Sequence, residues 1–387
     1  MSRIEQLIAE LCPDGVEYRT VNDVCKVSRG RVISKDFIRI NHGNYPVYSS
    51  QTANDGILGT INSFDFDGEF LTWTTDGAYA GSVFYRNGKF SITNVCGLLE
   101  VKENALHPRF LLYYLNIVAK KYVSEGMGNP KLMSNAMAKI PIPIPPLPIQ
   151  QEIVRILDTF TDLDAELQAE LEARKKQYEH YRNQLLNFEG KEVEWKSIVD
   201  CFELKNGYTP SKSKSEYWEN GNIPWFRMED IRKNGRILSD AIQHITPEAV
   251  KSKLFPSNSI LLATTATIGE HALITVPSLA NQQFTYITLR KSFESKINMK
   301  YFYYFMFIVD EWCKNNTNVS GFSSVDMAKF RKLLIPIPSL SEQERIVSIL
   351  DKFEALVNDE LPAEIDARRK QYEYYREKLL AFEPLVS

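Results

Sequence analysis

Cysteine and histidine are both scarce in this chain of 387 residues, which has five of each. The cysteines are odd in number and form no Cys-x-x-Cys pair, so their spacing favours neither a disulfide framework nor a zinc site. The histidines are scattered, without the spacing of metal ligands. We therefore expect no metal on this chain and a reducing compartment, the cytoplasm.

Long hydrophobic runs are also lacking. The longest, residues 301–309, is far too short to cross a bilayer. The N-terminal stretch predicts a short amphipathic helix that ends before Pro13, and it does not have the pattern of a signal peptide. We expect no association with membranes.

An excess of positive charge is missing too, since the net charge is −3. The balance differs between segments. Residues 149–189 carry 5 basic and 9 acidic side chains, and residues 341–387 carry 7 and 11, whereas residues 194–335 carry 18 and 14. The acidic excess therefore belongs to two segments, and the net charge does not exclude DNA contact by the rest of the chain.

What the chain does have is one long internal repeat. The run IPIPIPPLPIQQEIVRILDTF begins at residue 140, and IPIPSLSEQERIVSILDKF begins at residue 335. Phe160 aligns with Phe353 at an offset of 193, but Tyr178 aligns with Tyr372 at 194, so the second copy gains one residue in between. A period this long indicates a duplicated half-protein rather than a solenoid.

Each copy of the repeat predicts a long helix with an apolar stripe. Apolar residues recur at steps of three, four and seven, with a local stutter after Leu167 and a possible Pro kink at residues 361–362. Two stripes of matching period favour packing on each other as a spacer, although two ordinary amphipathic helices packed on their own domains would show similar stripes. The predicted spacer positions are Ile153, Ile156, Phe160, Leu163, Leu167, Tyr178 and Leu185, with Ile346, Ile349, Phe353, Leu356, Tyr372 and Leu379 in the second copy.

The segments between the long helices are predicted to be globular. Residues 16–30 and 193–207 share a strand-like start and a final Gly, so the duplication extends into these parts. Residues 43–103 predict short strands and turns, including a hairpin at Asn87-Gly88. Each globular part ends in an Ile-Pro-Ile-Pro run, which predicts an extended connector because proline cannot continue a helix.

This doubled arrangement resembles the specificity (S) subunit of Type I restriction–modification enzymes. The resemblance covers the whole chain and rests on the two proline runs that enter the helices, on GNIPWFRMEDI, on LLATTATIG and on NQQF. It implies an α+β fold with two target-recognition domains, joined by two long helices that form an antiparallel coiled-coil spacer with an internal pseudo-two-fold repeat. The domain boundaries we predict are 1–140 and 190–335 for the recognition domains, with 141–189 and 336–387 for the connectors and spacer helices.

The resemblance also implies a function and a set of partners. Each recognition domain would read one half of a split double-stranded DNA target, and the spacer would set the distance between the halves and dock two modification (methyltransferase) subunits. Restriction subunits would add DNA translocation and cleavage. The chain itself would be non-catalytic and without cofactor, because S-adenosylmethionine, ATP and Mg²⁺ are expected on the partner subunits.

The first globular part departs from the family pattern, since it has YPVYSSQTANDG where a copy of IPWFRMEDI would fall. We therefore expect two recognition domains of different subtypes. Polar loops at strand ends supply the candidate DNA contacts, with Arg and Gln suited to base edges and Lys to phosphate. In the first domain these are Arg29, Arg31, Lys35, Tyr48, Ser49, Ser50, Gln51, Asn54, Thr74, Thr75, Asp76 and Tyr79. In the second they are Lys212, Lys214, Arg227, Arg232, Lys233, Arg236, Thr264, Thr265, Gln282, Gln283, Phe322 and Ser323.

Other function classes remain open at this point. Asn222-Ile-Pro-Trp imitates the Asn-Pro-Pro-aromatic loop of amino-methyltransferases, but its second residue is Ile and no glycine-rich cofactor turn follows. Asp76 with Glu100 and Lys102 imitates a metal-dependent nuclease motif that is common by chance. A stand-alone DNA-binding regulator, or a coiled-coil adaptor, would also explain part of the chain.

Overall fold

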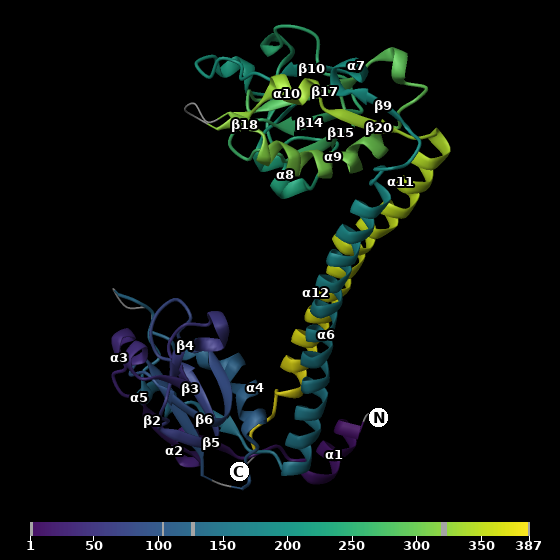
Figure 1. The fold of residues 1–387 in the computed structure, drawn as a ribbon. Coiled ribbons are helices and arrows are strands. Elements are labelled where there is room, and N and C mark those ends of the chain that lie inside the picture. Colours follow the sequence, from purple (N-terminus) through teal and green to yellow (C-terminus); the bar gives the residue numbers. More distant parts are fainter. Residues whose placement is uncertain (1–2, 103, 125–127, 319–322, 386–387) are drawn as a thin grey trace. The chain divides into compact units, whose positions relative to one another are not determined.

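The computed structural model describes residues 3–102, 104–124, 128–318 and 323–385, and it divides into two compact units. Unit 1 comprises Met1–Gln168 and Ala363–Ser387, and unit 2 comprises Ala169–Pro362. Each unit contains one globular α+β part together with segments of the long helices (Figure 1). Within the described part of the chain, no helix is long and apolar enough to cross a membrane.

The globular part of unit 1 is built on a six-stranded sheet with the order β2-β7-β5-β6-β3-β4. The fully buried Trp73 anchors its core, and the Trp73 indole N–H donates to the carbonyl of Leu132 at 2.9 Å. Helix α4 packs on β5 and β6 (Figure 1). The elements of this part are α1 (Arg3–Leu11), β1 (Tyr18–Thr20), α2 (Val21–Val24), β2 (Cys25–Arg29), α3 (Lys35–Ile40), β3 (His42–Tyr48), β4 (Ile57–Ile61), β5 (Phe66–Thr74), β6 (Val83–Ile92), β7 (Cys96–Val101), α4 (Pro108–Val118) and α5 (Ser134–Met137).

The hairpin predicted at Asn87-Gly88 is wrong. Strand β6 runs through both residues and pairs along its length with β5. Gly88 lies opposite Gly68, and both have positive φ, +98° and +131°. The two glycines allow both strands to take this unusual backbone conformation at the same point without forming a turn. Pairing with a long neighbouring strand therefore overrides the local turn signal.

The globular part of unit 2 has a five-stranded sheet with the order β10-β17-β14-β15-β12 and a separate three-stranded sheet with the order β13-β11-β16. Helix α9 packs on β15. The elements are β9 (Glu194–Ser197), α7 (Ile198–Cys201), β10 (Phe202–Asn206), β11 (Ile223–Phe226), α8 (Met228–Asn234), β12 (Ile237–Leu238), β13 (His244–Ile245), β14 (Ser259–Ala263), β15 (His271–Ile274), β16 (Leu279–Ala280), β17 (Phe284–Leu289), α9 (Met299–Asn315), β18 (Thr317–Asn318), β19 (Ser324–Val325) and α10 (Met327–Arg331).

Both proline runs are extended, as predicted, and each also forms a short strand. Strand β8 (Pro141–Pro143) pairs antiparallel with β1, and β20 (Leu334–Ile337) pairs antiparallel with β9. Proline is tolerated there because each sheet has only two strands, so the missing N–H can face outward. The strand that opens each globular part is thus tied to the run that leads into its long helix.

The two long helices are α6 (Leu147–Leu185) and the sequence α11 (Leu340–Ala355) to α12 (Leu361–Leu379). In unit 1 the start of α6 packs against the end of α12. The Phe160 ring lies 5.8 Å from the Tyr375 ring and 6.1 Å from that of Tyr372. Arg369 donates to Asp164 at 2.7 and 3.1 Å.

In unit 2 the end of α6 packs against α11 through the same residue types. The Phe353 ring lies 5.6 Å from the Tyr181 ring and 6.4 Å from that of Tyr178. In both units the start of one helix therefore meets the end of the other, which makes the pair an antiparallel coiled coil. The predicted stripe residues are all buried or half-buried.

The extra residue of the second copy lies in a π-helical turn. Residues Leu356–Glu360 form this turn between α11 and α12, within the interval where the repeat offset changes from 193 to 194. A π turn closes an i→i+5 hydrogen bond and so holds one residue more than an α turn. Pro362, at the position of the predicted kink, lies shortly after this turn in the first turn of α12 and has no N–H for the α pattern.

Candidate nucleic-acid interface

Three predicted residues of unit 1, Arg29, Thr75 and Asp76, meet at one end of the six-stranded sheet, where β2 and β5 end. Arg29 Nη2 donates to Thr75 Oγ1 at 2.7 Å, and Thr75 Oγ1 donates to Asp76 at 2.6 Å. Asp76 also lies 3.6 Å from Arg29 and 3.8 Å from Lys131. A charged, hydrogen-bonded network therefore closes this end of the sheet.

The loop after β3 joins the same end. Thr93 donates through its backbone N–H to Tyr48 O and through its hydroxyl to Ser49 Oγ at 3.0 Å. Thr93 also forms a β-bridge with Arg31, whose guanidinium pairs with Asp65 at 3.0 Å. The loop residues predicted for DNA contact are thus brought next to the Arg29 network.

A residue that the sequence analysis missed, Arg86, holds this loop in place. Its side chain is 3% exposed, donates to the Asp55 carboxylate at 2.6 Å and the Asp55 carbonyl at 2.8 Å, and lies over the Tyr48 ring at 3.7 Å. Asn54 and Asp55 both have φ of +51°, a strained conformation for non-glycine residues. The available signal was a single Arg on the apolar face of a strand, because a buried guanidinium requires a charged or hydrogen-bonding partner.

The remaining predictions in unit 1 divide by exposure. Lys35, Asn54 and Tyr79 are exposed, and Ser50 and Gln51 are half-buried, with the Gln51 amide donating to the Ile57 carbonyl. The side chains of Thr74 and Thr75 are buried. These two threonines can position the network but do not present a free surface.

In unit 2 four predicted residues line one polar pocket of about 510 Å³. They come from the loop after β10, the end of β11 and the turn before β17: Lys212, Arg227, Gln282 and Gln283. Gln282 is exposed and hydrogen-bonded to the hydroxyl of Thr209, so its amide is held in place. Amide and guanidinium groups around one hollow match the donors and acceptors of base edges.

Aromatic rings form the apolar part of the same pocket. Trp218 and Trp225 pack edge to face with centroids 4.8 Å apart, and their indole N–H groups donate to backbone carbonyls. Both rings line the pocket together with Gln243 and Asn281, which the sequence analysis did not select. The site therefore combines stacking surfaces with hydrogen-bonding groups.

Another missed residue, Asp230, positions Arg227. Asp230 is fully buried and accepts hydrogen bonds from the backbone N–H groups of Arg227 and Ile242, each at 2.6 Å. It thereby joins the turn between β11 and α8 to the segment before β13. An acidic residue in the first turn of a helix was the signal in the sequence.

The other predicted residues of unit 2 that the structure describes do not line this pocket. Lys214 bonds to the Tyr217 hydroxyl, which raises the pKa of the lysine, and Lys233 pairs with Glu229, which lowers the pKa of that carboxyl. Arg236 turns inward to Asp310 at 3.4 Å. Of the remainder, Thr264 is buried, Thr265 is half-buried, Arg232 and Ser323 are exposed, and Phe322 lies outside the described residues.

The two interfaces are equivalent positions of the repeat. Gly30 and Gly207 follow β2 and β10, and a Cβ at either would lie 2.1 or 2.3 Å from a carbonyl oxygen of a neighbouring segment. The carbonyls of Thr75 and Thr264 accept from residues 132 and 325, and Asp76 and Thr265 form matching bridges. The same backbone frame thus presents different side chains in the two units.

The acids of the nuclease-like motif are engaged by cations in the structure. Asp76 is paired with Arg29 and Lys131, and Glu100 with Lys26 at 3.3 Å. Across the described residues, no group of three or more His, Cys, Asp or Glu side chains could hold a metal ion. Burial raises the pKa of all five cysteine thiols, to about 12 for Cys25, Cys96 and Cys313, so they remain protonated.

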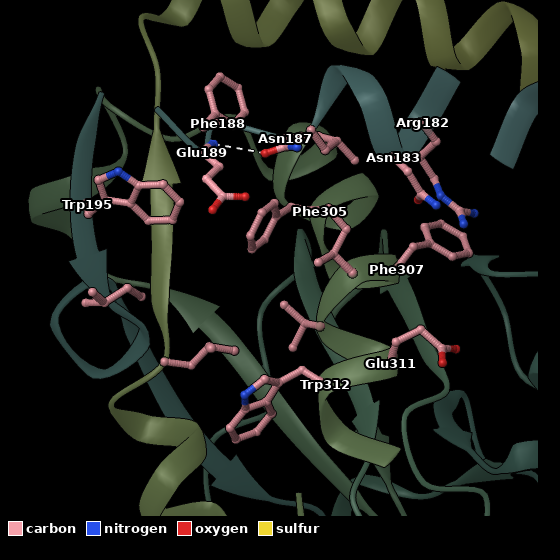
Figure 2. Close-up of a pocket in the computed structure, with 15 residues that line it drawn as sticks. Arg182, Asn183, Asn187, Phe188, Glu189, Trp195, Phe305, Phe307, Glu311 and Trp312 are labelled. Atoms are coloured by element: carbon pink, nitrogen blue, oxygen red, sulfur yellow. Dashed lines mark hydrogen bonds between the residues drawn. The ribbon is translucent and has the colours of Figure 1, made fainter. Parts of the chain in front are cut away.

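A second, apolar pocket of about 530 Å³ lies in unit 2 where α6 ends (Figure 2). Figure 2 shows Trp195, Phe305 and Trp312 around it, with Phe307 next to Arg182. The Trp195 ring comes from β9, the rings of Phe305, Phe307 and Trp312 come from α9, and Phe188 follows the end of α6. None of the predicted DNA contacts lines this pocket.

An equivalent pocket of about 660 Å³ lies in unit 1. Tyr18 takes the place of Trp195 there, since each pairs with a proline of its unit's proline run. Tyr114 takes the place of Phe305, and Lys121 that of Trp312. The repeat thus carries two related hollows where the long helices meet the globular parts.

Comparison with known proteins shows the family to which this chain is similar. Residues 13–173 and 190–367 each match the Type I restriction modification DNA specificity domain. A putative type I specificity subunit of Mycoplasma pneumoniae is 34% identical over 367 residues, covering 93% of this chain and 96% of the relative. The EcoprrI specificity subunit of Escherichia coli is 55% identical over 205 residues, which is 50% of this chain and about half (51%) of the relative.

Solved structures agree on the fold. The HsdS subunit from Thermoanaerobacter tengcongensis aligns over 96% of this chain and 97% of its own, with a TM-score of 0.57 and 14% identity. A chain from work on complex assembly and conformational transition of the type I R-M system aligns over the same shares, with a TM-score of 0.66 and 14% identity. The repeated match to the family domain covers most of the sequence, and the chain belongs to the family of type I restriction–modification specificity subunits.

Proposed function

We propose that this chain recognises a bipartite DNA sequence, each globular part reading one half and the antiparallel helices setting the distance between the halves. As a specificity subunit the chain is non-catalytic. The observation that carries the proposal is the pair of equivalent polar sheet ends, one in each unit, at the same backbone positions of the repeat. Side chains at loop tips of a rigid sheet can reach base edges in a groove.

The two halves of the target are expected to differ. Unit 1 presents Arg29, Arg31 and Asp76 from one six-stranded sheet, whereas unit 2 presents Arg227 and the amides of the Gln282-Gln283 turn beside a second, three-stranded sheet. Arginine suits guanine, and a glutamine amide suits adenine. A single chain with two different readers does not require a palindromic target.

Exposed lysines support the proposal through phosphate contact. Lys35 lies at the start of α3, and Lys212 and Lys214 lie in the loop after β10. Contacts of this kind fix orientation and carry no sequence information. The three lysines therefore set register, and the polar sheet ends read the bases.

The chain is proposed to work with two modification subunits and with restriction subunits. The two related hollows at the ends of the long helices support two copies of one partner, because an internally repeated surface offers the same shape twice. In this assembly S-adenosylmethionine, ATP and Mg²⁺ are bound by the partner subunits. Methyl transfer and DNA cleavage then depend on this chain only for the choice of target.

Methylation mapping tests the function directly. The chain is co-expressed with its neighbouring modification subunit in a host without such systems, and methylated bases are located by single-molecule sequencing. A split motif, methylated on both strands only when this chain is present, is the expected result. The absence of any new motif from a folded complex would contradict the proposal and favour an adaptor or a regulator.

A further inference from the structure

The turn between β16 and β17 carries two glutamines of the polar pocket in unit 2, Gln282 and Gln283. The same turn exists in unit 1. The carbonyl of Gln283 accepts from the backbone N–H of Thr264, just as the carbonyl of Val95 accepts from that of Thr75. The two units thus share the backbone of this turn but not its side chains, and a side chain at such a position can change what is read without changing the fold.

Hydrogen bonds fix which way the Gln283 amide points. The backbone N–H of Gln283 donates to Asn281 Oδ1 at 3.0 Å, and a backbone N–H can only donate. The other end of the Asn281 amide is therefore its NH2 group, which donates to Gln283 Oε1 at 3.2 Å. The oxygen of Gln283 is thus turned to Asn281, and the NH2 group of Gln283 is left as a donor for a ligand.

A hydroxyl holds Gln282 in the same sense. Thr209 Oγ1 donates to Gln282 Oε1 at 2.5 Å, so the NH2 group of this exposed side chain is also left as a donor. Arg227 lines the same pocket, and its guanidinium can only donate. The turn therefore offers two neighbouring amide donors beside a cationic donor.

The pocket also has an amide acceptor, Gln243. The NH2 group of Gln243 donates to the carbonyl of His244 at 2.9 Å and to that of Trp218 at 3.4 Å, and both carbonyls can only accept. Gln243 Oε1 is therefore the end that remains for a ligand. Two amide donors and one amide acceptor thus line the same hollow.

This polarity distinguishes between base pairs. In the major groove adenine presents one acceptor and one donor, thymine one acceptor and a methyl group, and cytosine one donor, whereas guanine presents two acceptors, O6 and N7. A glutamine pairs with adenine when both ends of its amide face the base. The oxygen ends of Gln282 and Gln283 face Thr209 and Asn281 instead. Two donors side by side match guanine.

We propose that the polar pocket of unit 2 reads a G·C base pair, with the NH2 groups of Gln282 and Gln283 on guanine and Gln243 Oε1 on the amino group of cytosine. Thr209 and Asn281 are positioning residues, because they set the polarity of the two donor amides. The inference rests on the proposed function in DNA recognition. It adds the identity of one base pair in the half-site that unit 2 reads.

Base analogues test the acceptors on the DNA. Methylation mapping of the wild type gives the motif, and the position that the pocket reads is the one whose base preference is lost in Gln283→Ala. Binding of the complex with modification subunits to labelled duplexes is then measured by fluorescence anisotropy. At that position 7-deazaguanine, which lacks the N7 acceptor, is expected to weaken binding about fivefold, whereas inosine, which keeps O6 and N7, serves as the control and should bind like guanine.

Substitutions of the positioning residues test the polarity of the amides. Thr209→Val removes the hydroxyl that holds Gln282, and the preference for G·C over A·T should fall about fivefold. Thr209→Ser keeps the hydroxyl and is the matched control, which should retain the preference. In Asn281→Asp the new carboxylate can only accept, so the Gln283 amide should turn over and present its oxygen. The preference should then shift from guanine toward adenine or cytosine, which carry an amino donor.

An A·T pair at the position that Gln283→Ala identifies would overturn the inference, as would equal binding of guanine and 7-deazaguanine there. Equal preferences in Thr209→Val and Thr209→Ser, or an unchanged preference in Asn281→Asp, would overturn the role of these residues and with it the assigned polarity. A split motif without any position that responds to Gln283→Ala would also overturn the inference, but it would leave bipartite recognition in place. Failure of the proposed function is different, because the wild type would then give no split motif at all.

Discussion

At the scale of single residues, one buried glutamine in each unit joins the globular part to its long helix. Gln150 donates to the carbonyls of Ala105 and Pro145 and accepts from the backbone N–H of His107, at 2.7 to 2.8 Å. Gln343 makes the same three bonds to Lys296, Pro338 and Asn298 at 2.8 Å. This geometry explains why Gln follows both proline runs.

Replacing either glutamine should destabilise its unit. In Gln150→Ala or Gln343→Ala, three backbone groups lose their partner, one of them a buried proline carbonyl, at a cost of about 2–4 kcal/mol in the free energy of unfolding. Urea titration followed by circular dichroism measures the loss. The neighbouring Gln151→Ala removes an exposed side chain and should cost under about 0.5 kcal/mol. Equal losses for Gln150 and Gln151 would contradict this role.

Arg86 supports a second prediction at this scale. Arg86→Met keeps the length of the side chain but removes its hydrogen bonds to Asp55 and its charge over Tyr48. The loop of residues 49–56 should then open more easily, by about 2–3 kcal/mol. Hydrogen exchange of the amides of residues 49–57 should rise by one to two orders of magnitude, while β7 stays protected. Unchanged exchange in the loop would exclude a positioning role for Arg86.

Residues of this kind also mark the limit of sequence reasoning. Arg29, Arg227 and the Gln282-Gln283 turn could be selected because polar side chains at strand ends are visible as local patterns. Gln150, Arg86 and Asp230 were not selected, because their local signals do not show the partners that the fold brings close to them. The hydrogen bond between Gln150 and Ala105, for example, spans 45 positions.

At the scale of elements, the sequence predicts a structure correctly where the pattern itself indicates what the element packs against. The long helices follow from their apolar stripe, and their antiparallel pairing agrees with the family. The hairpin at Asn87-Gly88 failed because strand β5, which lies earlier in the chain, pairs with both flanks of the turn signal. The π turn at Leu356–Glu360 was visible only as a one-residue change in the repeat offset.

The π turn gives a test of that interpretation. Deleting Asp359, an exposed residue of the turn, removes the inserted residue and should convert the turn to α-helix, with a change in stability below about 1 kcal/mol. Deleting Lys370 in α12 instead rotates Gln371–Leu379 by about 100° relative to α6. Tyr372 and Tyr375 then leave Phe160, and the midpoint of thermal unfolding should fall by several degrees. Similar losses of stability for both deletions would contradict the interpretation that the π turn holds the inserted residue.

At the scale of the whole molecule, the repeat is what makes two different readers possible in one chain. The backbone frame around Gly30 and Gly207 is shared, while the side chains on it have diverged. Duplication keeps the packing of helix on helix and leaves the loop tips free to change. Both halves retain the features that join the globular parts to the long helices. These features are the proline runs, the buried glutamines and the aromatic clusters.

If the helices set the distance between the halves of the target, lengthening them should change that distance. Inserting a second copy of residues 165–168 after Gln168 adds about 6 Å of helix, which corresponds to one or two base pairs of spacer. Methylation mapping of the variant should return the same two half-sites with a longer gap between them. The same four residues inserted after Gly190, outside the helix, serve as the control and should leave the gap unchanged. An unchanged gap in the helix variant would remove the helices from the role of spacer, because the half-sites would then be positioned by the globular parts alone.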